Sequence, residues 1–392
     1  MHPVAPAGAG TPDEPDVPDA PATAPAFLAA RRARVRPPES VLGFIRSLRS
    51  YHFEVAFRAA LAVALPLIVL AGLGRIDWAA YAAFGAMTAL YGRNEPYSTR
   101  LRTVSVAGAL MLAIIAFGLL LAVVQAPLWV LTGGLLLVIV VSILVASTAG
   151  LFPATAIFFV FGYAVVAQIP TAAGDVWPRL LVAVLAAGFA WLLTLSGALL
   201  RRAAGERTPA LFKNLLRTAV AYPGAYRDPQ VWLTIVQNVL GALAAGALAL
   251  SLGFGHPYWA VVAVIAVLPP PRGAHSVARA VHRIVGTTVG VGISAAILLP
   301  GPPVWVLILV IGVGQFGAEI FIGRHYGVAL LFVTPLALSV VHLVSVVPVE
   351  NLLIDRVLET TLGGLVALVI VLMVRGLQSR RRRRHPFTEP AG

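Results

Sequence analysis

The chain has 392 residues, of which 59% are hydrophobic and only 11% are charged. Soluble globular proteins carry about 25% charged residues, so the composition excludes an ordinary soluble domain and predicts a polytopic membrane protein. The formal net charge of +13 does not indicate a nucleic-acid partner, because the basic residues cluster at the ends of apolar runs. The sequence contains no cysteine, which excludes disulfides, zinc–thiolate sites and thiol nucleophiles.

The two ends of the chain differ in composition from the rest. Residues 1–40 are rich in proline and alanine with scattered acids, and such a segment does not bury enough apolar surface to fold. We expect a disordered cytoplasmic tail there. Residues 377–392 are strongly basic and predict a second cytoplasmic tail.

Apolar runs fill most of the remaining sequence and predict an all-α polytopic membrane protein with about twelve transmembrane helices. The expected segments are 55–73, 76–91, 103–124, 128–147, 150–168, 178–200, 231–252, 257–270, 284–299, 303–322, 326–347 and 357–375. Nearly all basic residues fall on one side when the N-terminus is placed in the cytoplasm. The positive-inside rule therefore predicts a multi-pass protein of the cytoplasmic membrane with both termini inside.

Residues 201–230 separate two halves, 41–200 and 231–376. Within this linker Leu211, Phe212 and Leu215 share one helical face, and Lys213 and Arg217 lie opposite. We expect an amphipathic helix on the inner membrane surface and not a catalytic domain.

The two halves match each other at a nearly constant offset. The matched pairs are Trp78 with Trp259, Arg102 with Arg283, Arg179 with Arg356, and Pro153 with Pro335, each 177 to 182 residues apart. Each half contains six predicted segments, so both halves enter and leave on the same side. This predicts two parallel six-helix repeats related by an axis along the membrane normal.

In both halves a short apolar segment follows the matched tryptophan, at 76–91 and 257–270. A matched pair of short segments interrupted by proline or glycine is a pointer to the binding region of a transporter. A short helix buried inside the bundle is the other interpretation, and the two are compatible.

The helix after the second short segment carries a polar face. Arg283, Thr287, Gly290 and Ser294 are spaced i, i+4, i+7 and i+11 and share that face. A guanidinium with a hydroxyl one turn away holds a carboxylate by charge-assisted hydrogen bonds. Gly286 and Gly290 form a small-xxx-small pair that lets another helix approach closely.

The matching face in the first half begins at Arg102 and is less polar, so we expect the two half-sites to differ. Arg102 and Arg283 are also interpretable as membrane anchors. However, a helix N-terminus is a poor place for a cation, because the helix dipole is positive there. Both arginines are therefore candidates for an anion path.

Several other charged and aromatic residues lie in apolar surroundings, where they are functional candidates. Glu319 is a candidate for proton coupling or the ion-pair partner of Arg324. His282 is a lesser candidate for a proton relay, because it is expected on a solvated cytoplasmic face with His275 and Arg279. Two further ion pairs are expected within helices, Arg58 with Glu54 and Arg356 with Glu359. Trp78 and Trp259 are expected in the interfacial aromatic belt, and substrate stacking is their less favoured use.

The second half resembles a known family. The resemblance rests on Tyr258-Trp-Ala, Arg279, His282-Arg283-Ile-Val and Gly286-Thr287. This run resembles the signature of the fusaric-acid-resistance-like, or aromatic acid exporter, family and is similar to a run in the plant aluminium-activated malate channels. Arg58 also resembles the family's first-span opening, whereas the first half is degenerate at Ser105 and Val106. The resemblance implies outward passage of organic anions, usually aromatic or hydroxylated carboxylates.

These features predict an exporter of small organic carboxylates, either proton-coupled or facilitative, whose basic cytoplasmic mouth gathers anions. An anion channel is the alternative, since rings of arginine select anions. The sequence shows no metal-ligand spacing and no phosphate-binding loop, so we expect no enzyme, cofactor or metal. The expected partners are the lipid bilayer and small organic anions, without nucleic acid, and a homo-oligomer is compatible with the sequence.

Overall fold

The computed structural model describes residues 40–48, 50–93, 95–204, 221–271, 273–344 and 347–384. Most of the expected N-terminal tail, the centre of the linker (205–220) and the end of the basic tail lie outside these residues. The chain divides into two units, Met1–Leu48 and Arg49–Gly392. In the first unit, α2 (Val41–Arg46) is a short helix whose N-cap Ser40 accepts a hydrogen bond from the Gly43 N–H at 3.1 Å.

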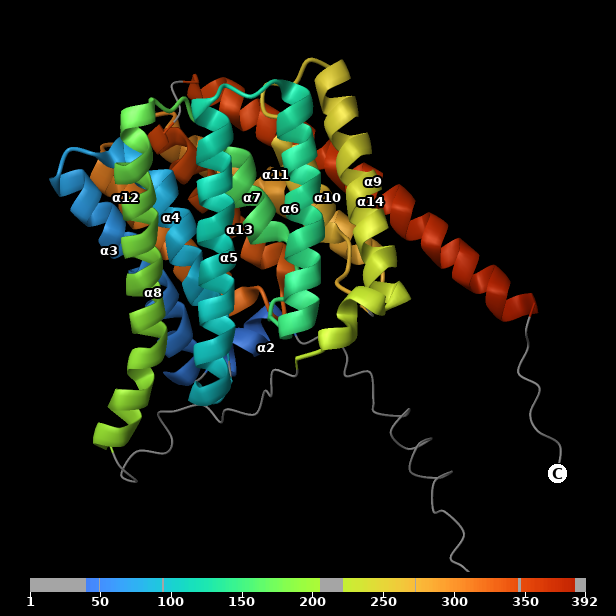
Figure 1. Cartoon of the computed structure of the whole chain (residues 1–392), viewed down its shortest axis with the longest axis horizontal. Helices are drawn as coiled ribbons and strands as arrows, with labels where there is room; N and C mark the ends of the chain where they lie inside the picture. Colours follow the sequence, from blue (N-terminus) through green and yellow to red (C-terminus); the bar gives the residue numbers. More distant parts are fainter. Residues whose placement is uncertain are drawn as a thin grey trace, which may run out of the picture. The chain divides into compact units, whose positions relative to one another are not determined.

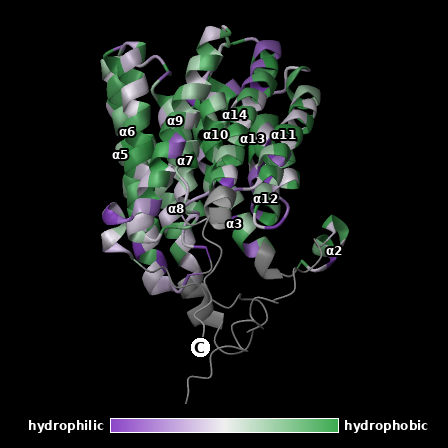
Figure 2. Cartoon of the chain, turned by 90° about the vertical axis from the view of Figure 1, so that its right-hand side faces the viewer, coloured by the Kyte–Doolittle hydropathy of each residue, from purple (hydrophilic) through white to green (hydrophobic). Residues whose placement is uncertain are grey.

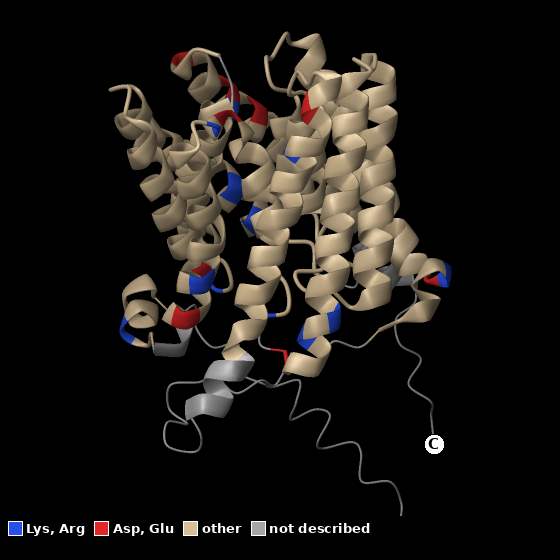
Figure 3. Ribbon diagram, turned by 60° about the vertical axis from the view of Figure 1, so that its left-hand side comes forward, with Lys and Arg blue, Asp and Glu red and all other residues tan. Residues whose placement is uncertain are grey.

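The regular secondary structure in the described part of the second unit is helical, with no strands (Figure 1). In the described residues, nine helices are long and apolar enough to cross a membrane. They are α3 (Ser50–Gly72), α5 (Tyr97–Val123), α6 (Leu128–Ala149), α8 (Val176–Ala204), α9 (Pro229–Ser251), α11 (Val277–Leu298), α12 (Val304–Phe321), α13 (Tyr326–Val344) and α14 (Val349–Arg384). Figure 2 shows that most of their residues are hydrophobic, and Figure 3 shows that charged residues are sparse along them. The chain is a membrane protein.

Among its described residues, this unit has three further α-helices that are too short to span a bilayer: α4 (Ala79–Ala86), α7 (Ile157–Val166) and α10 (Tyr258–Val267). Ten helical residues rise about 15 Å, half of the roughly 30 Å of a hydrocarbon core. Every residue of α4 and α10 is buried. The expected number of twelve complete spans is therefore not confirmed: nine of the expected segments form helices of spanning length, and three form half-length helices inside the bundle.

The apolar composition of α10 explains its burial. Its ten residues, YWAVVAVIAV, are apolar on all sides, as expected for a helix that packs against neighbours all round. Pro257 precedes it. The prolines that follow Leu268 end the helix, since a residue before proline disfavours helical geometry.

The helices of each half make similar neighbour contacts. In the first half α4 packs against α3 and α8, and α5 packs against α7 and α8. In the second half α10 packs against α9 and α14, and α11 packs against α13 and α14. Between the halves, α3 packs against α12, α6 against α9, α4 against α13 and α7 against α10. The short helices therefore lie where the two halves meet.

Glycines bring α11 and α13 close together. A Cβ atom on Gly286 would lie 2.7 Å from the Gly327 carbonyl oxygen, and one on Gly290 would lie 2.7 Å from the Thr334 Cβ. Real Cβ atoms do not approach other atoms so closely, so both positions require glycine. The close helix approach expected at these two glycines is confirmed, and Arg283 lies one turn before them.

Candidate anion-binding site

A cavity of about 180 Å³ lies between the two halves. The short helices and their flanking turns supply much of its apolar wall, including Phe158, Phe161 and Trp259. Its polar lining residues are Thr155, Arg279, Arg283, Gln315, Glu319, Tyr326 and Arg356. Larger hollows of about 330 and 510 Å³ are lined by mostly apolar residues. Of these three spaces, the 180 Å³ cavity is the one that contains arginines.

Arg356 extends from α14 into this cavity and is 1% exposed. Its guanidinium carbon lies 3.7 Å from the centre of the Trp259 ring. Within the described part of the chain, neither Nε nor Nη1 has a hydrogen-bond acceptor. A guanidinium carries five N–H donors and stays charged, so the site buries a charge that the described protein atoms leave incompletely paired.

Arg283 extends from α11 into the same cavity and is 2% exposed. Its Nε also lacks an acceptor among the described residues, and its positive charge acts on Arg356. Nearby buried donors without a described partner are Trp259 Nε1, Thr287 Oγ1 and Tyr326 OH. Two like charges with unused donors are costly in a low-dielectric interior unless an anion compensates them.

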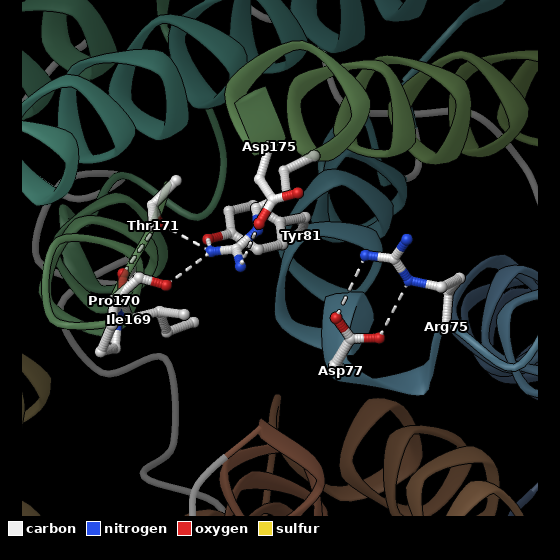
Figure 4. A network of polar contacts seen from close by, with 8 residues as sticks. Arg75, Asp77, Tyr81, Ile169, Pro170, Thr171 and Asp175 are labelled. Carbon is white, nitrogen blue, oxygen red and sulfur yellow. Dashed lines mark hydrogen bonds and ion pairs between the residues drawn. The ribbon is translucent and has the colours of Figure 1, made fainter. Parts of the chain in front are cut away.

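Arg179, the residue that matches Arg356 in the first half, has a different environment, although its Nε also lacks an acceptor among the described residues. Figure 4 shows Tyr81, Pro170, Thr171 and Asp175 gathered around one guanidinium. Arg179 Nη1 donates to Tyr81 OH at 3.2 Å, to the Pro170 carbonyl oxygen at 3.0 Å and to Thr171 Oγ1 at 2.7 Å. Its Nη2 pairs with Asp175 Oδ2 at 3.3 Å. Arg179 is thus a structural residue with its own protein partners.

Glu319 forms an ion pair across the two halves. Arg93 Nη1 lies 3.2 Å from Glu319 Oε2, and Arg93 Nη2 donates to the Glu319 carbonyl oxygen at 2.7 Å. The carboxylate that lines the cavity is therefore matched by a cation from the first half, and it does not neutralise Arg283 and Arg356. The expected pair of Arg58 with Glu54 is confirmed at 3.2 Å.

The second half of the chain matches a known family model. Residues 239–370 match the family model for fusaric acid resistance protein-like proteins. The resemblance expected from the sequence is confirmed over this segment, which includes Trp259, Arg283, Glu319 and Arg356. No curated protein and no solved structure matches the chain. Together with the membrane-length helices, the match indicates a membrane transport protein.

Within the matched segment, Arg279 lies at the rim of the cavity. Its side chain is exposed, its Nε donates to the Ala266 carbonyl oxygen at 2.7 Å, and its guanidinium lies 4.2 Å from the centre of the Tyr326 ring. We expected Arg279 on a solvated face with His275 and His282. Arg279 is solvated but also lines the cavity, so it is more than a surface charge.

The two histidines lie outside the lining of the cavity. His282 is exposed on α11, which gives a proton relay through it no geometric support. His275 is half-buried, with Nε2 3.1 Å from Gln237 Oε1. Burial lowers the pKa of His275 below its ordinary value, so its neutral form is favoured at pH 7.

The first-half arginine, Arg102, does not line the cavity. It is exposed and donates from Nη2 to the Ala149 carbonyl oxygen at 3.3 Å. The buried arginine of α5 is Arg100, whose Nη1 lies 3.4 Å from the Thr194 carbonyl oxygen. Two residues along a helix correspond to a rotation of about 200°, so burial of Arg100 turns Arg102 outward. The non-equivalence expected of the two half-sites is larger than the sequence indicates.

Two other residues of the expected polar face are buried and do not line the cavity. Ser294 donates to the Gly290 carbonyl oxygen of its own helix at 2.7 Å. Thr287 lies fully buried one turn from Arg283. Arg283 is therefore the one member of this face that reaches the cavity.

The expectation of an interfacial belt is wrong for Trp259, which is fully buried on α10 with its ring 4.9 Å from that of Phe161. Trp78 is half-buried, and the Arg75 guanidinium lies 3.4 Å from its ring centre. Figure 4 shows Arg75 paired with Asp77.

The expected pairing of Arg356 with Glu359 is also absent from the described ion pairs. The Glu359 Oε1 accepts a hydrogen bond from the His256 backbone N–H at 2.7 Å. The position of Arg356 in the cavity wall was not predicted, because an i, i+3 acid was its simplest partner in the sequence. The repeat offset identified its position but not its surroundings.

Proposed function

We propose that the chain is a transporter that exports small aromatic carboxylate anions, and that the cavity between the halves is its substrate site. The observation that carries the proposal is the pair of buried arginines, Arg283 and Arg356, with unused donors in one cavity. A carboxylate accepts from guanidinium groups in bidentate geometry and supplies the missing negative charge.

The size and walls of the cavity support a single-ring substrate. A cavity of about 150 Å³ lined by apolar side chains holds one benzene molecule, and this cavity measures about 180 Å³. Phe158, Phe161 and Trp259 offer aromatic surfaces for the ring. A benzoate-sized anion fits with its carboxylate toward the arginines.

The proposal includes two parallel repeats. Its support is that the contacts of α3, α4 and α5 with their neighbours are matched by those of α9, α10 and α11. The seams agree as well, since α3 packs against α12 as α9 packs against α6. The repeat is imperfect: Pro153 precedes α7, whereas Pro335 lies inside α13.

We place the protein in the cytoplasmic membrane with both termini inside, because the basic clusters then face the cytoplasm. In this orientation Arg279 and the Arg93–Glu319 pair lie toward the inner side, where anions are gathered. The proposed partners are the lipid bilayer and the transported anion. The proposed mechanism requires no catalytic group, cofactor or nucleic acid.

Export of labelled benzoate tests the proposal. We expect cells that overproduce the protein to lose preloaded benzoate faster than cells without it, and Arg283→Ala to abolish this gain at unchanged membrane abundance. Near-normal flux in that variant would make Arg283 an anchor. The alternative of an anion channel predicts single-channel current steps in a planar bilayer. A saturating flux without such steps supports the transporter.

A further inference from the structure

A cluster of three titratable residues lies beside the cavity, where α10 and α14 begin. It consists of His256, Asp355 and Glu359, whose ligand-type atoms all lie within 4.8 Å of one another. His256 Nδ1 lies 2.8 Å from Asp355 Oδ2, and the His256 backbone N–H donates to Glu359 Oε1 at 2.7 Å. The cluster therefore joins the segment before α10 to α14.

Glu359 is the buried member of the cluster. Its side chain is 0% exposed, and its Oε2 has no hydrogen-bond donor among the residues that the structure describes. A second carboxylate, Asp355, lies close by. Two carboxylates in a buried site do not both ionise readily, because desolvation and mutual repulsion favour a shared proton.

The other groups near Glu359 form no described ion pair that would neutralise its carboxylate. Tyr258 of α10 is buried, and the Trp259 backbone N–H donates to the His256 carbonyl oxygen at 2.9 Å. Arg356 lies three residues before Glu359 on α14, but its guanidinium stacks on the Trp259 ring, and no described ion pair joins the two residues. Arg283 of α11 and Tyr326 of α13 act on Arg356 from the cavity side.

We infer that this cluster is a proton-binding site linked to the anion site, so that anion binding in the cavity takes up a proton at Glu359. The inference rests on the proposed function, because it assigns a regulator to that same site. Arg356 lies between the two sites on one helix. An ionised Glu359 lowers the positive potential that Arg356 offers to a carboxylate, and a protonated Glu359 leaves it intact.

Binding of labelled benzoate to the full chain in lipid nanodiscs tests the linkage. Between about pH 6 and pH 9, benzoate stays ionised. We expect its affinity to fall about tenfold as the pH rises, a typical size for coupled sites. Glu359→Gln, a neutral mimic of the protonated acid, should keep the tighter affinity throughout. Glu350→Gln, an exposed acid on the same helix, should keep the pH dependence.

A pH-dependent affinity retained in Glu359→Gln would overturn the inference. A pH dependence of benzoate affinity that disappears in EDTA would also overturn the inference, because that result would show that the cluster binds a divalent cation. If Glu359→Gln fails to fold, the wild-type protein alone tests the inference. Benzoate added to wild-type protein in weakly buffered nanodiscs should raise the pH of the medium, because binding takes up a proton. Benzoate binding without proton uptake contradicts the linkage.

An infrared titration of the protein without benzoate separates this inference from the proposed function. We expect a protonated carboxylic-acid band near neutral pH that is absent from Glu359→Gln. The band without benzoate binding at any pH would refute the proposed function and leave the proton site standing. Absence of the band from the wild-type protein would refute the proton site itself.

Discussion

At the residue scale, the same position in the two halves has two different environments. Arg179 has hydrogen bonds to three oxygen atoms and an ion pair with Asp175. Arg356, its match, stacks on Trp259 and has donors without a described acceptor. Identity of residue type at matched positions therefore does not give identity of role. The partners, which come from other helices, decide whether the charge is structural or available to a ligand.

This contrast predicts opposite effects of one substitution. Arg179→Gln removes the hydrogen bonds of a buried guanidinium and its ion pair with the partly exposed Asp175, and it should destabilise the fold by about 1.5–3 kcal/mol. Arg356→Gln removes an incompletely paired buried charge and should leave stability unchanged or raise it. Thermal unfolding of both variants in detergent measures the difference. Equal losses of stability would show that Arg356 is structural as well.

Sequence patterns identified part of the site at this scale. Arg283 was predicted because it was expected to start a helix, where a mere anchor is poorly placed. That premise is wrong, because α11 begins at Val277 and places Arg283 in its second turn. Trp259 and Arg356 were assigned to an interfacial belt and an ion pair, because neighbours along the sequence were the only partners visible. Their stacking joins α10 to α14, residues almost 100 positions apart, and no local spacing encodes it.

At the element scale, hydropathy located all the helices of the bundle but not their lengths. Residues 257–270 were expected to be a short segment, either a transporter's interrupted span or a helix buried in the bundle, and α10 spans ten residues. A short helix buried on all sides is as apolar as a membrane span, so composition does not distinguish them. The prolines that follow Leu268 were the usable signal, and the same region was correctly identified as unusual for its short length.

Close packing of α11 on α13 predicts a difference between two glycines on one helix. Gly290→Ala places a Cβ atom 2.7 Å from the Thr334 Cβ and 2.9 Å from the Leu330 carbonyl oxygen, so α13 must move away. We expect a loss of about 1–3 kcal/mol from overpacking. Gly292→Ala is the control, since nothing lies within 4 Å of its added Cβ. Thermal midpoints that fall equally in both variants would contradict this packing.

At the scale of the whole molecule, the two halves close around the cavity along two seams, α3 with α12 and α6 with α9. The short helices meet between these seams, and the ion pair of Arg93 with Glu319 joins the halves on one side of the cavity. The offset between matched residues predicted that the chain is built of two halves. It did not predict which helices pair across the seams, because that depends on tertiary packing.

The seam between α3 and α12 is testable by cross-linking, since the chain has no cysteine. A Cβ atom on Gly312 would lie 3.5 Å from the Ala64 Cβ, within the range of about 3.5–4.5 Å that disulfides require. We expect Ala64→Cys with Gly312→Cys to form a disulfide in membranes. A protease site inserted into residues 205–220 allows the chain to be cut between the halves. On a denaturing gel the two cut halves should then migrate together until the disulfide is reduced. The single variant Gly312→Cys is the control, and its halves should separate without reductant. The same separation in the double variant would contradict the packing of α3 on α12.

The proposed function depends on Arg283 and Arg356 holding a carboxylate in the cavity. Binding of labelled benzoate to the protein in nanodiscs, with benzamide as neutral competitor of the same shape, tests it most directly. We expect benzoate to bind, benzamide not to compete, and Arg283→Gln and Arg356→Gln each to weaken benzoate binding at least about tenfold, as for a lost charged hydrogen-bond partner. Equal binding of benzoate and benzamide, or wild-type affinity in both variants, would contradict the claim.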